Sequence, residues 1–140
     1  MKKISFIIIA IVLCVNANAQ QRKSSYKYSD IEGIWLVTAG YNENEKEWQP
    51  LSDDGGMVFA FVPITTQGKR IAMLNNSGGL VHFTYKLANN TIRMYDIGDP
   101  SKVVITISIL SVVRGQNFIG RMSTMNSDYS AKFMFIHIDE

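Results

Sequence analysis

The side chains that could do chemistry in this 140-residue chain are few and far apart. The only two histidines are His82 and His137. Neither has a serine and an acid at a spacing typical of nucleophilic catalysis. A metal site needs three or four converging ligands, and two histidines with one cysteine, Cys14, do not supply them. The sequence therefore predicts no catalytic residues, no metal site and no cofactor, and a protein that is not an enzyme.

One candidate polar group centres on Asp96. This residue alternates in phase with Ile92 and Met94, so it would point with them into a core. A buried carboxylate needs a partner, and Arg121 or His137 could provide one. Such a group would anchor the polar head of a ligand or serve as a catalytic acid. The alternative is that Asp96 lies at a strand end and faces water.

Eight apolar runs of period-two alternation must position these side chains. They span residues 33–41, 56–62, 70–74, 80–87, 91–97, 102–113, 117–122 and 129–138. Short connections favour antiparallel neighbours, because parallel strands need long crossovers. The pattern predicts an all-β protein, an eight-stranded antiparallel up-and-down barrel without free edges. Pro63 is expected to end the second strand, and residues 42–50 are expected to form a loop.

The same alternation assigns side chains to the inside of the barrel. An eight-stranded barrel either fills its interior with side chains or holds one small ligand. A ligand would need apolar walls and a few polar anchors, for which Tyr85 and Asp96 are the candidates. The predicted ligand-binding residues are Phe59, Phe61, Phe83, Tyr85, Met94, Asp96, Ile105, Phe133 and Phe135.

The first nineteen residues have the features of an export signal. Lys2 and Lys3 precede the apolar run 4–15, and small residues at Ala17 and Ala19 suit a cleavage site after Ala19. The run is shorter than the roughly 20 residues of a membrane-spanning helix. We expect a signal peptide over residues 1–19, a flexible arm over 20–29 and a barrel domain over 30–140.

Lipidation at Cys14 is the alternative fate of this signal. A lipobox has a small residue directly before its cysteine, whereas Leu13 stands at that position here. The expected location is the periplasm or the cell exterior, with no transmembrane segment in the mature chain.

Removing the signal changes the charge of the protein. The whole chain has 14 Lys and Arg against 12 Asp and Glu, a formal charge of +2. Lys2 and Lys3 leave with the signal, so the mature chain is neutral. Nucleic-acid binding relies on an excess of basic residues, and no nucleic-acid partner is expected. Cys14 also leaves, so the mature chain has no disulfides.

The opening of the first run, Gly33-Ile34-Trp35, resembles the entry of a lipocalin-like barrel. In that family a Gly-x-Trp begins the first strand, and its Trp plugs the closed end. The eight-run plan is similar to small exported lipocalin-like (calycin-type) domains of Gram-negative bacteria. The resemblance implies structural roles for Gly33 and Trp35 and a basic residue stacked on the indole, for which Lys132 and Arg121 are candidates. The chain departs from the family at residues 113–116, where Thr-Asp-Tyr is missing.

These features predict an exported, non-catalytic binding module with a small apolar or amphipathic ligand in the barrel lumen. The first alternative is an envelope-associated or secreted protein-interaction barrel with a filled interior. Loop residues Tyr41, Trp48 and Asp53 would then make the contacts, unless Trp48 folds back onto the barrel. The second alternative is an isomerase or cyclase in which Asp96, His137 and Tyr85 converge inside the lumen.

Overall fold

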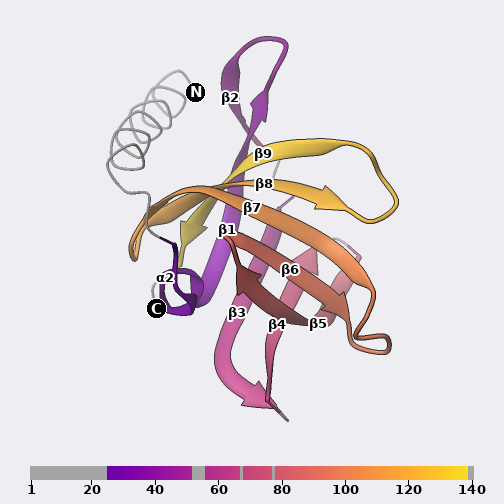
Figure 1. Cartoon of the computed structure of the whole chain (residues 1–140). Coiled ribbons are helices and arrows are strands. Elements are labelled where there is room, and N and C mark those ends of the chain that lie inside the picture. Colours follow the sequence, from indigo (N-terminus) through magenta and orange to yellow (C-terminus); the bar gives the residue numbers. More distant parts are fainter. Residues whose placement is uncertain (1–24, 52–55, 67, 77, 139–140) are drawn as a thin grey trace.

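The computed structural model describes residues 25–51, 56–66, 68–76 and 78–138, which form a closed β-barrel (Figure 1). The described strands make one antiparallel sheet in the order β2-β1-β3-β4-β5-β6-β7-β8-β9, and β1 also pairs with β9. This last pairing closes eight strands into an up-and-down barrel, and β2 is an extra strand beside β1. The predicted fold class is confirmed, and the architecture is compatible with a lipocalin-like barrel.

The strands lie close to the predicted apolar runs, because period-two alternation matches a sheet with one buried face. A four-residue helix, α2 (Tyr28–Ile31), precedes them. The strands are β1 (Gly33–Asn42), β2 (Glu47–Pro50), β3 (Met57–Thr66), β4 (Lys69–Asn76), β5 (Gly79–Ala88), β6 (Thr91–Asp96), β7 (Val103–Val113), β8 (Asn117–Thr124) and β9 (Ser130–His137).

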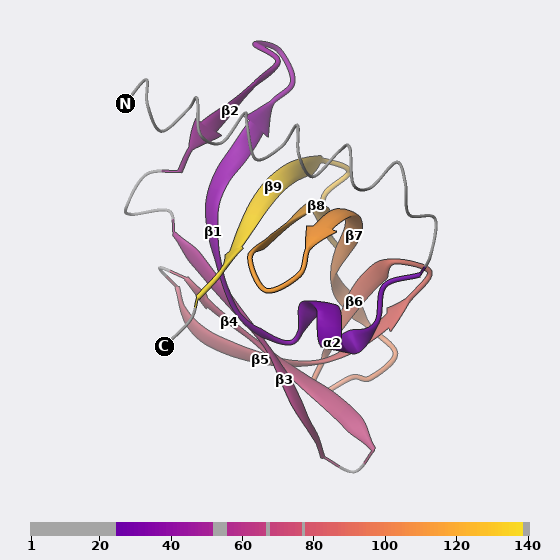
Figure 2. The same cartoon turned by 90° about the vertical axis from the view of Figure 1, so that its left-hand side faces the viewer.

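The prediction that Pro63 ends the second strand is wrong. Strand β3 pairs with β4 from Val58 to Phe61, and the pairing resumes at Thr65 after a shift in register. The ladder is therefore interrupted around Pro63, which has no N–H to donate. An irregularity of this kind lets a strand carry proline without ending. The β3–β4 hairpin continues beyond the body of the barrel (Figure 2).

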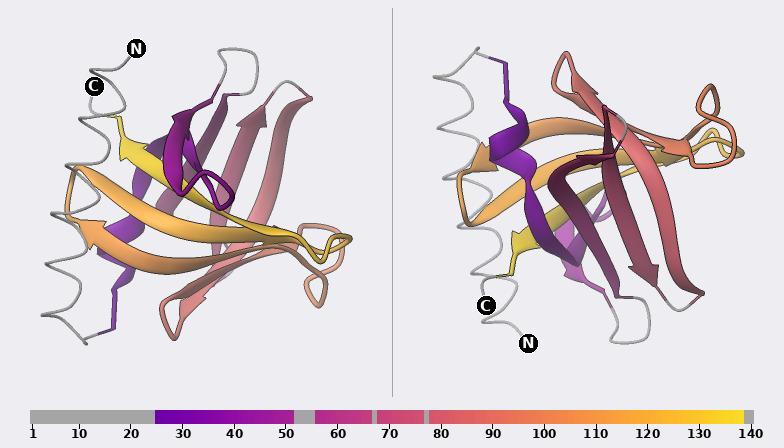
Figure 3. Two further views of the ribbon diagram at one scale, coloured as in Figure 1. Left: turned by 90° about the horizontal axis from the view of Figure 1, so that it is seen from above. Right: turned by 90° about the horizontal axis from the view of Figure 1, so that it is seen from below.

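Residues 47–50 form strand β2 instead of the predicted loop. Trp48 pairs with Tyr41 of β1, and its side chain is buried against Ala39, Ile119 and Met134. These residues make a small second core on the outer face of the barrel, where the β1–β2 hairpin lies beside β9 (Figure 3, left). Trp48 thus folds back onto the barrel, which was one of its two expected placements.

The interior of the barrel is occupied by packed apolar side chains. Phe118 stacks on Phe135 with ring centroids 4.2 Å apart, and Phe59 meets Phe135 edge-on at 5.6 Å. Such filling is one of the two outcomes that an eight-stranded barrel allows. The buried cluster comprises Ile31, Trp35, Val37, Phe59, Phe61, Ala72, Leu74, Phe83, Tyr85, Ile92, Met94, Ile105, Ile107, Ile109, Phe118 and Phe135.

Helix α2 lies across the end of the barrel where β1 begins (Figure 2), and Ile31 and Trp35 belong to the buried core. Trp35 is 1% exposed, and its indole N–H donates a hydrogen bond to the carbonyl of Ile31 over 2.7 Å. The edges of the Phe118 and His137 rings pack against it at centroid distances of 4.8 and 4.9 Å. Trp35 is therefore a packed element of this closed end.

Neither Lys132 nor Arg121 covers the Trp35 indole, in contrast to the expectation from the resemblance. The Lys132 ammonium lies 4.1 Å from the ring centroid of Tyr41, and Arg121 pairs with Glu43 at 3.2 Å. Both residues alternate with inward-facing neighbours, so their side chains leave the outer face of the sheet. His137 takes the place beside the indole.

The segment 26–32 is fixed across the closed end by hydrogen bonds to several strands and turns. Arg114 bonds the buried carboxylate of Asp30 from both Nε and Nη2 at 2.9 Å. The N–H of Tyr26 donates to the side-chain oxygen of Asn90 over 2.7 Å. The predicted arm over residues 20–29 thus includes residues bound to the barrel, and residues 20–24 lie outside the described chain, as does the predicted signal. No helix in the described chain is long and apolar enough to cross a membrane.

Candidate functional site

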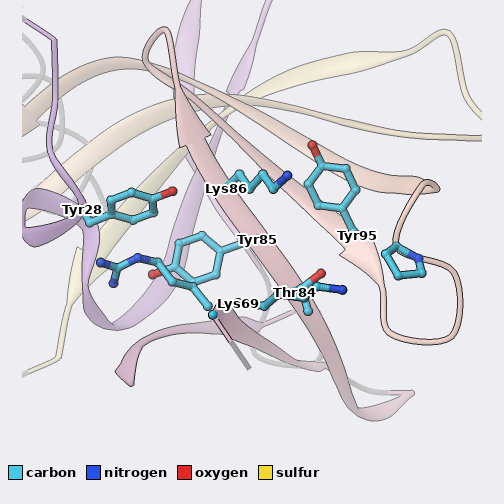
Figure 4. Close-up of a pocket in the computed structure, with 9 residues that line it drawn as sticks. Tyr28, Lys69, Thr84, Tyr85, Lys86 and Tyr95 are labelled. Atoms are coloured by element: carbon cyan, nitrogen blue, oxygen red, sulfur yellow. The ribbon is translucent and has the colours of Figure 1, made fainter. Parts of the chain in front are cut away.

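A cleft of about 410 Å³ opens along strand β5, near the closed end (Figure 4). It is lined by residues from α2, the β3–β4 turn, three strands and the β6–β7 loop. We call it the β5 cleft, and its lining residues are Tyr28, Gly68, Lys69, Arg70, Thr84, Tyr85, Lys86, Tyr95 and Pro100.

The β5 cleft exists because β4 is shorter than β5 at this end. The β4–β5 pairing begins with Arg70 opposite Tyr85, whereas β5 continues to Ala88. Beyond that pair, the N–H of Leu87 donates to the hydroxyl of Tyr28 over 3.1 Å instead of to a strand. An aromatic side chain from α2 therefore takes over the hydrogen bonding of the missing part of β4.

The β5 cleft reaches both faces of the sheet. Thr84 and Lys86 point outward and Tyr85 points inward, since successive side chains of a strand alternate, yet all three line the cleft. A pocket can touch both faces only where the wall of the barrel is interrupted. The start of β4 at Lys69 provides that interruption, beside the buried Tyr85 side chain.

Aromatic rings and cations alternate around the cleft. The Arg70 guanidinium carbon lies 3.9 Å from the ring centroid of Tyr28, and its Nη1 donates to Glu32 over 2.9 Å. The Lys86 ammonium lies 5.7 Å from the ring centroid of Tyr95. Both contacts have the geometry of cation–π interactions.

The hydroxyl of Tyr85 is a buried polar group that lies beside the Arg70 guanidinium and donates to no acceptor among the described residues. The side chain is 2% exposed, and its ring packs edge-on against Phe61 and Tyr28. Burial raises the pKa of Tyr85 to about 12, and the positive charge of Arg70 opposes this effect only in part. The group therefore stays protonated at neutral pH, as a buried O–H donor beside the cleft.

The raised pKa of Tyr85 predicts that this residue makes the folded protein less stable in alkali. The folded state favours the neutral phenol. The contribution of Tyr85 to the free energy of unfolding is therefore fully present below pH 10 and is lost as the pH rises towards 12. Between these values the wild type should lose roughly 2 kcal/mol more free energy of unfolding than Tyr85→Phe. Urea unfolding curves of both proteins from pH 8 to 12 measure this difference. Parallel pH profiles would contradict the prediction.

The structure separates the predicted ligand-binding residues other than Asp96 into three places. Tyr85 alone lines the β5 cleft, although it also belongs to the core. Six others lie in the packed core, namely Phe59, Phe61, Phe83, Met94, Ile105 and Phe135. Phe133 packs against that core and is partly buried. A ligand contact at these seven positions stays a prediction.

Asp96 and its candidate partners make separate contacts. The Asp96 carboxylate accepts the N–H of Gly98 over 2.7 Å at the end of β6. Arg121 pairs with Glu43 on the outer face, and His137 packs against Trp35 at the closed end. The structure thus supports the alternative in which Asp96 lies at a strand end, and it does not assemble a polar group from these residues. Within the described chain, no three His, Cys, Asp or Glu side chains gather as metal ligands would.

Several cleft residues were not singled out from the sequence. Arg70 alternates in phase with Ala72 and Leu74, which are both buried. A basic residue on the inward-facing side of a strand is unusual, and this signal could have identified Arg70 as a candidate. Tyr28 falls in the predicted flexible arm, and its sequence context carries no such signal. The sequence predicts only that Lys86 and Tyr95 are ordinary outward-facing residues.

Comparison with known proteins adds no relative from which a function could be transferred. No protein-family model matches the chain, and no curated protein matches it at a significant level. The functional inference for this eight-stranded barrel therefore depends on the geometry of the β5 cleft.

Proposed function

We propose that this barrel is an exported, non-catalytic binding module that holds one small amphipathic molecule in the β5 cleft. The observation that carries the proposal is the cleft itself, whose aromatic and basic walls include Arg70 and the buried Tyr85 beside it. An unsatisfied buried hydroxyl costs free energy, and a bound polar atom would remove that cost.

The size and lining of the cleft support a small-molecule ligand. Its volume of about 410 Å³ falls in the range of roughly 300–1,000 Å³ that is usual for such sites. Three tyrosines provide apolar surface with polar edges, as ligand pockets commonly do. The packed aromatic core leaves the cleft as a better candidate than the lumen.

Export and the absence of catalysis are parts of the same proposal. Export is supported by the basic start, the apolar run and the small residues around Ala19. A non-catalytic role is supported by the separate contacts of Asp96 and His137, which leave the cleft without a described acid–base pair.

Binding can be tested with an uncharged fluorescent probe, N-phenyl-1-naphthylamine. Thr84→Trp should fill the cleft and abolish saturable one-to-one binding of the probe. Thr106→Trp is the matched control, because Thr106 also points outward, from β7, and does not line the cleft. Binding should persist in this control. Native mass spectrometry of the exported protein would then identify a co-purified ligand.

Two outcomes would overturn the proposal. If the wild type binds neither this probe nor a charged analogue of it saturably, the cleft is not a small-molecule site. Binding that survives Thr84→Trp would move the ligand elsewhere, for example into the barrel interior.

The packed interior also favours the second candidate function, a protein-interaction barrel. Its predicted contacts receive less support, because Trp48 is 4% exposed and packs edge-on against Tyr41 at 5.4 Å. Asp53, the third predicted contact, lies outside the described residues. Failure of the wild type to bind the probe would favour this candidate over a small-molecule binder.

A further inference from the structure

The charges around the β5 cleft are of one sign. Lys69, Arg70 and Lys86 line it, and none of its described lining residues is acidic. Arg70 has one acidic partner, Glu32, whereas Lys69 and Lys86 form no ion pair with the described chain. The positive charge at the cleft is therefore only partly compensated. The remaining charge attracts anions that come within about a Debye length of it.

The aromatic faces at the cleft already hold cations of the protein itself. Arg70 lies over Tyr28, and Lys86 lies over Tyr95. A cationic ligand would have to displace these groups from the rings and approach two like charges. The arrangement thus disfavours an ammonium ligand, which tyrosines would otherwise be well suited to bind.

We infer that the β5 cleft binds a ligand with an anionic head and an apolar body. The head is a carboxylate, sulfonate or phosphate ester, and the body is a ring or another apolar group. The inference rests on the proposed function and names the chemical class of its ligand. Arg70 is the principal contact, because a guanidinium offers several N–H donors in one plane. Its Nη1 donates to Glu32 and the group also lies beside the Tyr85 hydroxyl, so several of its five N–H donors remain for an anion.

Tyr85 supplies the second polar contact. Its protonated hydroxyl is buried beside Arg70 and has no acceptor in the described chain, so an anionic oxygen that enters beside Arg70 would satisfy it. Hydrogen bonds to charged partners are stronger than those between neutral groups. The apolar body of the ligand lies against the tyrosine rings, between Tyr28 and Tyr95, which border the cleft from opposite sides (Figure 4).

Glu32 occupies Arg70 as a carboxylate of the protein itself. The two side chains lie 2.9 Å apart and are 25% and 27% exposed, so solvent reaches the pair. A bound anion competes with Glu32 for the guanidinium. Removing Arg70 should therefore lower the affinity for the anion, and removing Glu32 should raise it. If the ion pair had only a structural role, removal of either residue would lower the affinity.

The test uses two probes with one ring skeleton. 8-Anilinonaphthalene-1-sulfonate carries a sulfonate that N-phenyl-1-naphthylamine lacks. The sulfonate should bind the wild type about tenfold more tightly or better. Arg70→Gln should remove most of that advantage, and Glu32→Gln should strengthen sulfonate binding severalfold.

Further variants separate contact from folding. Tyr85→Phe keeps the ring and should weaken the sulfonate by about threefold to tenfold. Lys86→Gln breaks no ion pair within the described chain and removes only the cation beside Tyr95, so it changes the charge of the cleft with little change in packing. Arg121→Gln is the matched control, because Arg121 also pairs with a glutamate but lies away from the cleft. It should leave both probes unchanged.

The outcomes distinguish the two proposals. Equal affinity for both probes, or sulfonate binding unaffected by Arg70→Gln and Lys86→Gln, would overturn the anion inference while the cleft remains a binding site. A loss of affinity in Glu32→Gln would also overturn it. Lack of any binding sensitive to Thr84→Trp would overturn both proposals. Competition by benzoate and by phenyl phosphate then shows which anionic head binds better.

Discussion

Replacing Trp35 with alanine is expected to lower the free energy of unfolding by about 3–5 kcal/mol. The side chain is 1% exposed and packs against Phe118 and His137. Its removal leaves a cavity at the closed end and takes the indole donor from the carbonyl of Ile31. Because a domain of this size is stable by about 5–15 kcal/mol, the variant should keep only part of its stability.

Urea unfolding measures this loss, and the fluorescence of Trp48 reports the transition in the variant. Trp35→Phe is the graded control, since it keeps an aromatic ring but loses the hydrogen bond to Ile31. It should cost less than alanine, about 1–3 kcal/mol. A cost below about 1 kcal/mol for alanine would mean that Trp35 is not a packed part of this closed end.

Gly33→Ala should have the second-largest effect, a loss of about 2–4 kcal/mol. The added Cβ would lie 2.5 Å from Nε2 of His137, and Gly33 has a φ of +121°. Both a steric overlap and an unfavourable backbone conformation therefore oppose alanine. The positive φ and the close approach of the His137 side chain together favour glycine at position 33.

Gly79→Ala is the matched control for the backbone term. Gly79 has a similar φ of +106°, but an added Cβ there meets nothing within 4 Å. It should cost about 1–2 kcal/mol, less than Gly33→Ala, in the same thermal or urea unfolding experiment. Equal losses would show that the contact with His137 adds nothing. Gly33→Ala combined with His137→Ala should then restore part of the stability if the overlap is real.

Much of the barrel could be predicted because the relevant signals are local. Alternation placed Phe83 and Tyr85, Ile92 and Met94 on inward-facing phases, and all four are buried. The signal is strong wherever one face of a strand is buried and the other faces solvent. Turn residues then separated the strands, so neighbouring runs could be paired as hairpins.

The failures of prediction occur where that alternation is interrupted. Strand β3 continues past Pro63 through a shift in register, which no property of the proline itself announces. Strand β2 is short and lies in a charged stretch, and Trp48 becomes buried through contacts with β1, β8 and β9. Neither feature is visible from the order of polar and apolar residues.

The candidate site shows the same division more sharply. Tyr85 was predicted as a polar anchor from its place in a strand, but its neighbours in the cleft were not. Leu87 and Tyr28 are 59 positions apart and meet only because α2 lies across the closed end. Arg70 reaches Glu32 across 38 positions for the same reason.

The sequence by itself determined that this protein is an eight-stranded antiparallel barrel, because alternation and turn residues act between near neighbours. Only the tertiary structure decided that side chains pack the interior and that a basic, aromatic cleft opens along β5. The cleft depends on where β4 begins relative to the end of β5, and on which distant side chain bonds the part of β5 that β4 leaves unpaired. Such relations arise from packing between remote segments, which the local pattern of residues does not encode.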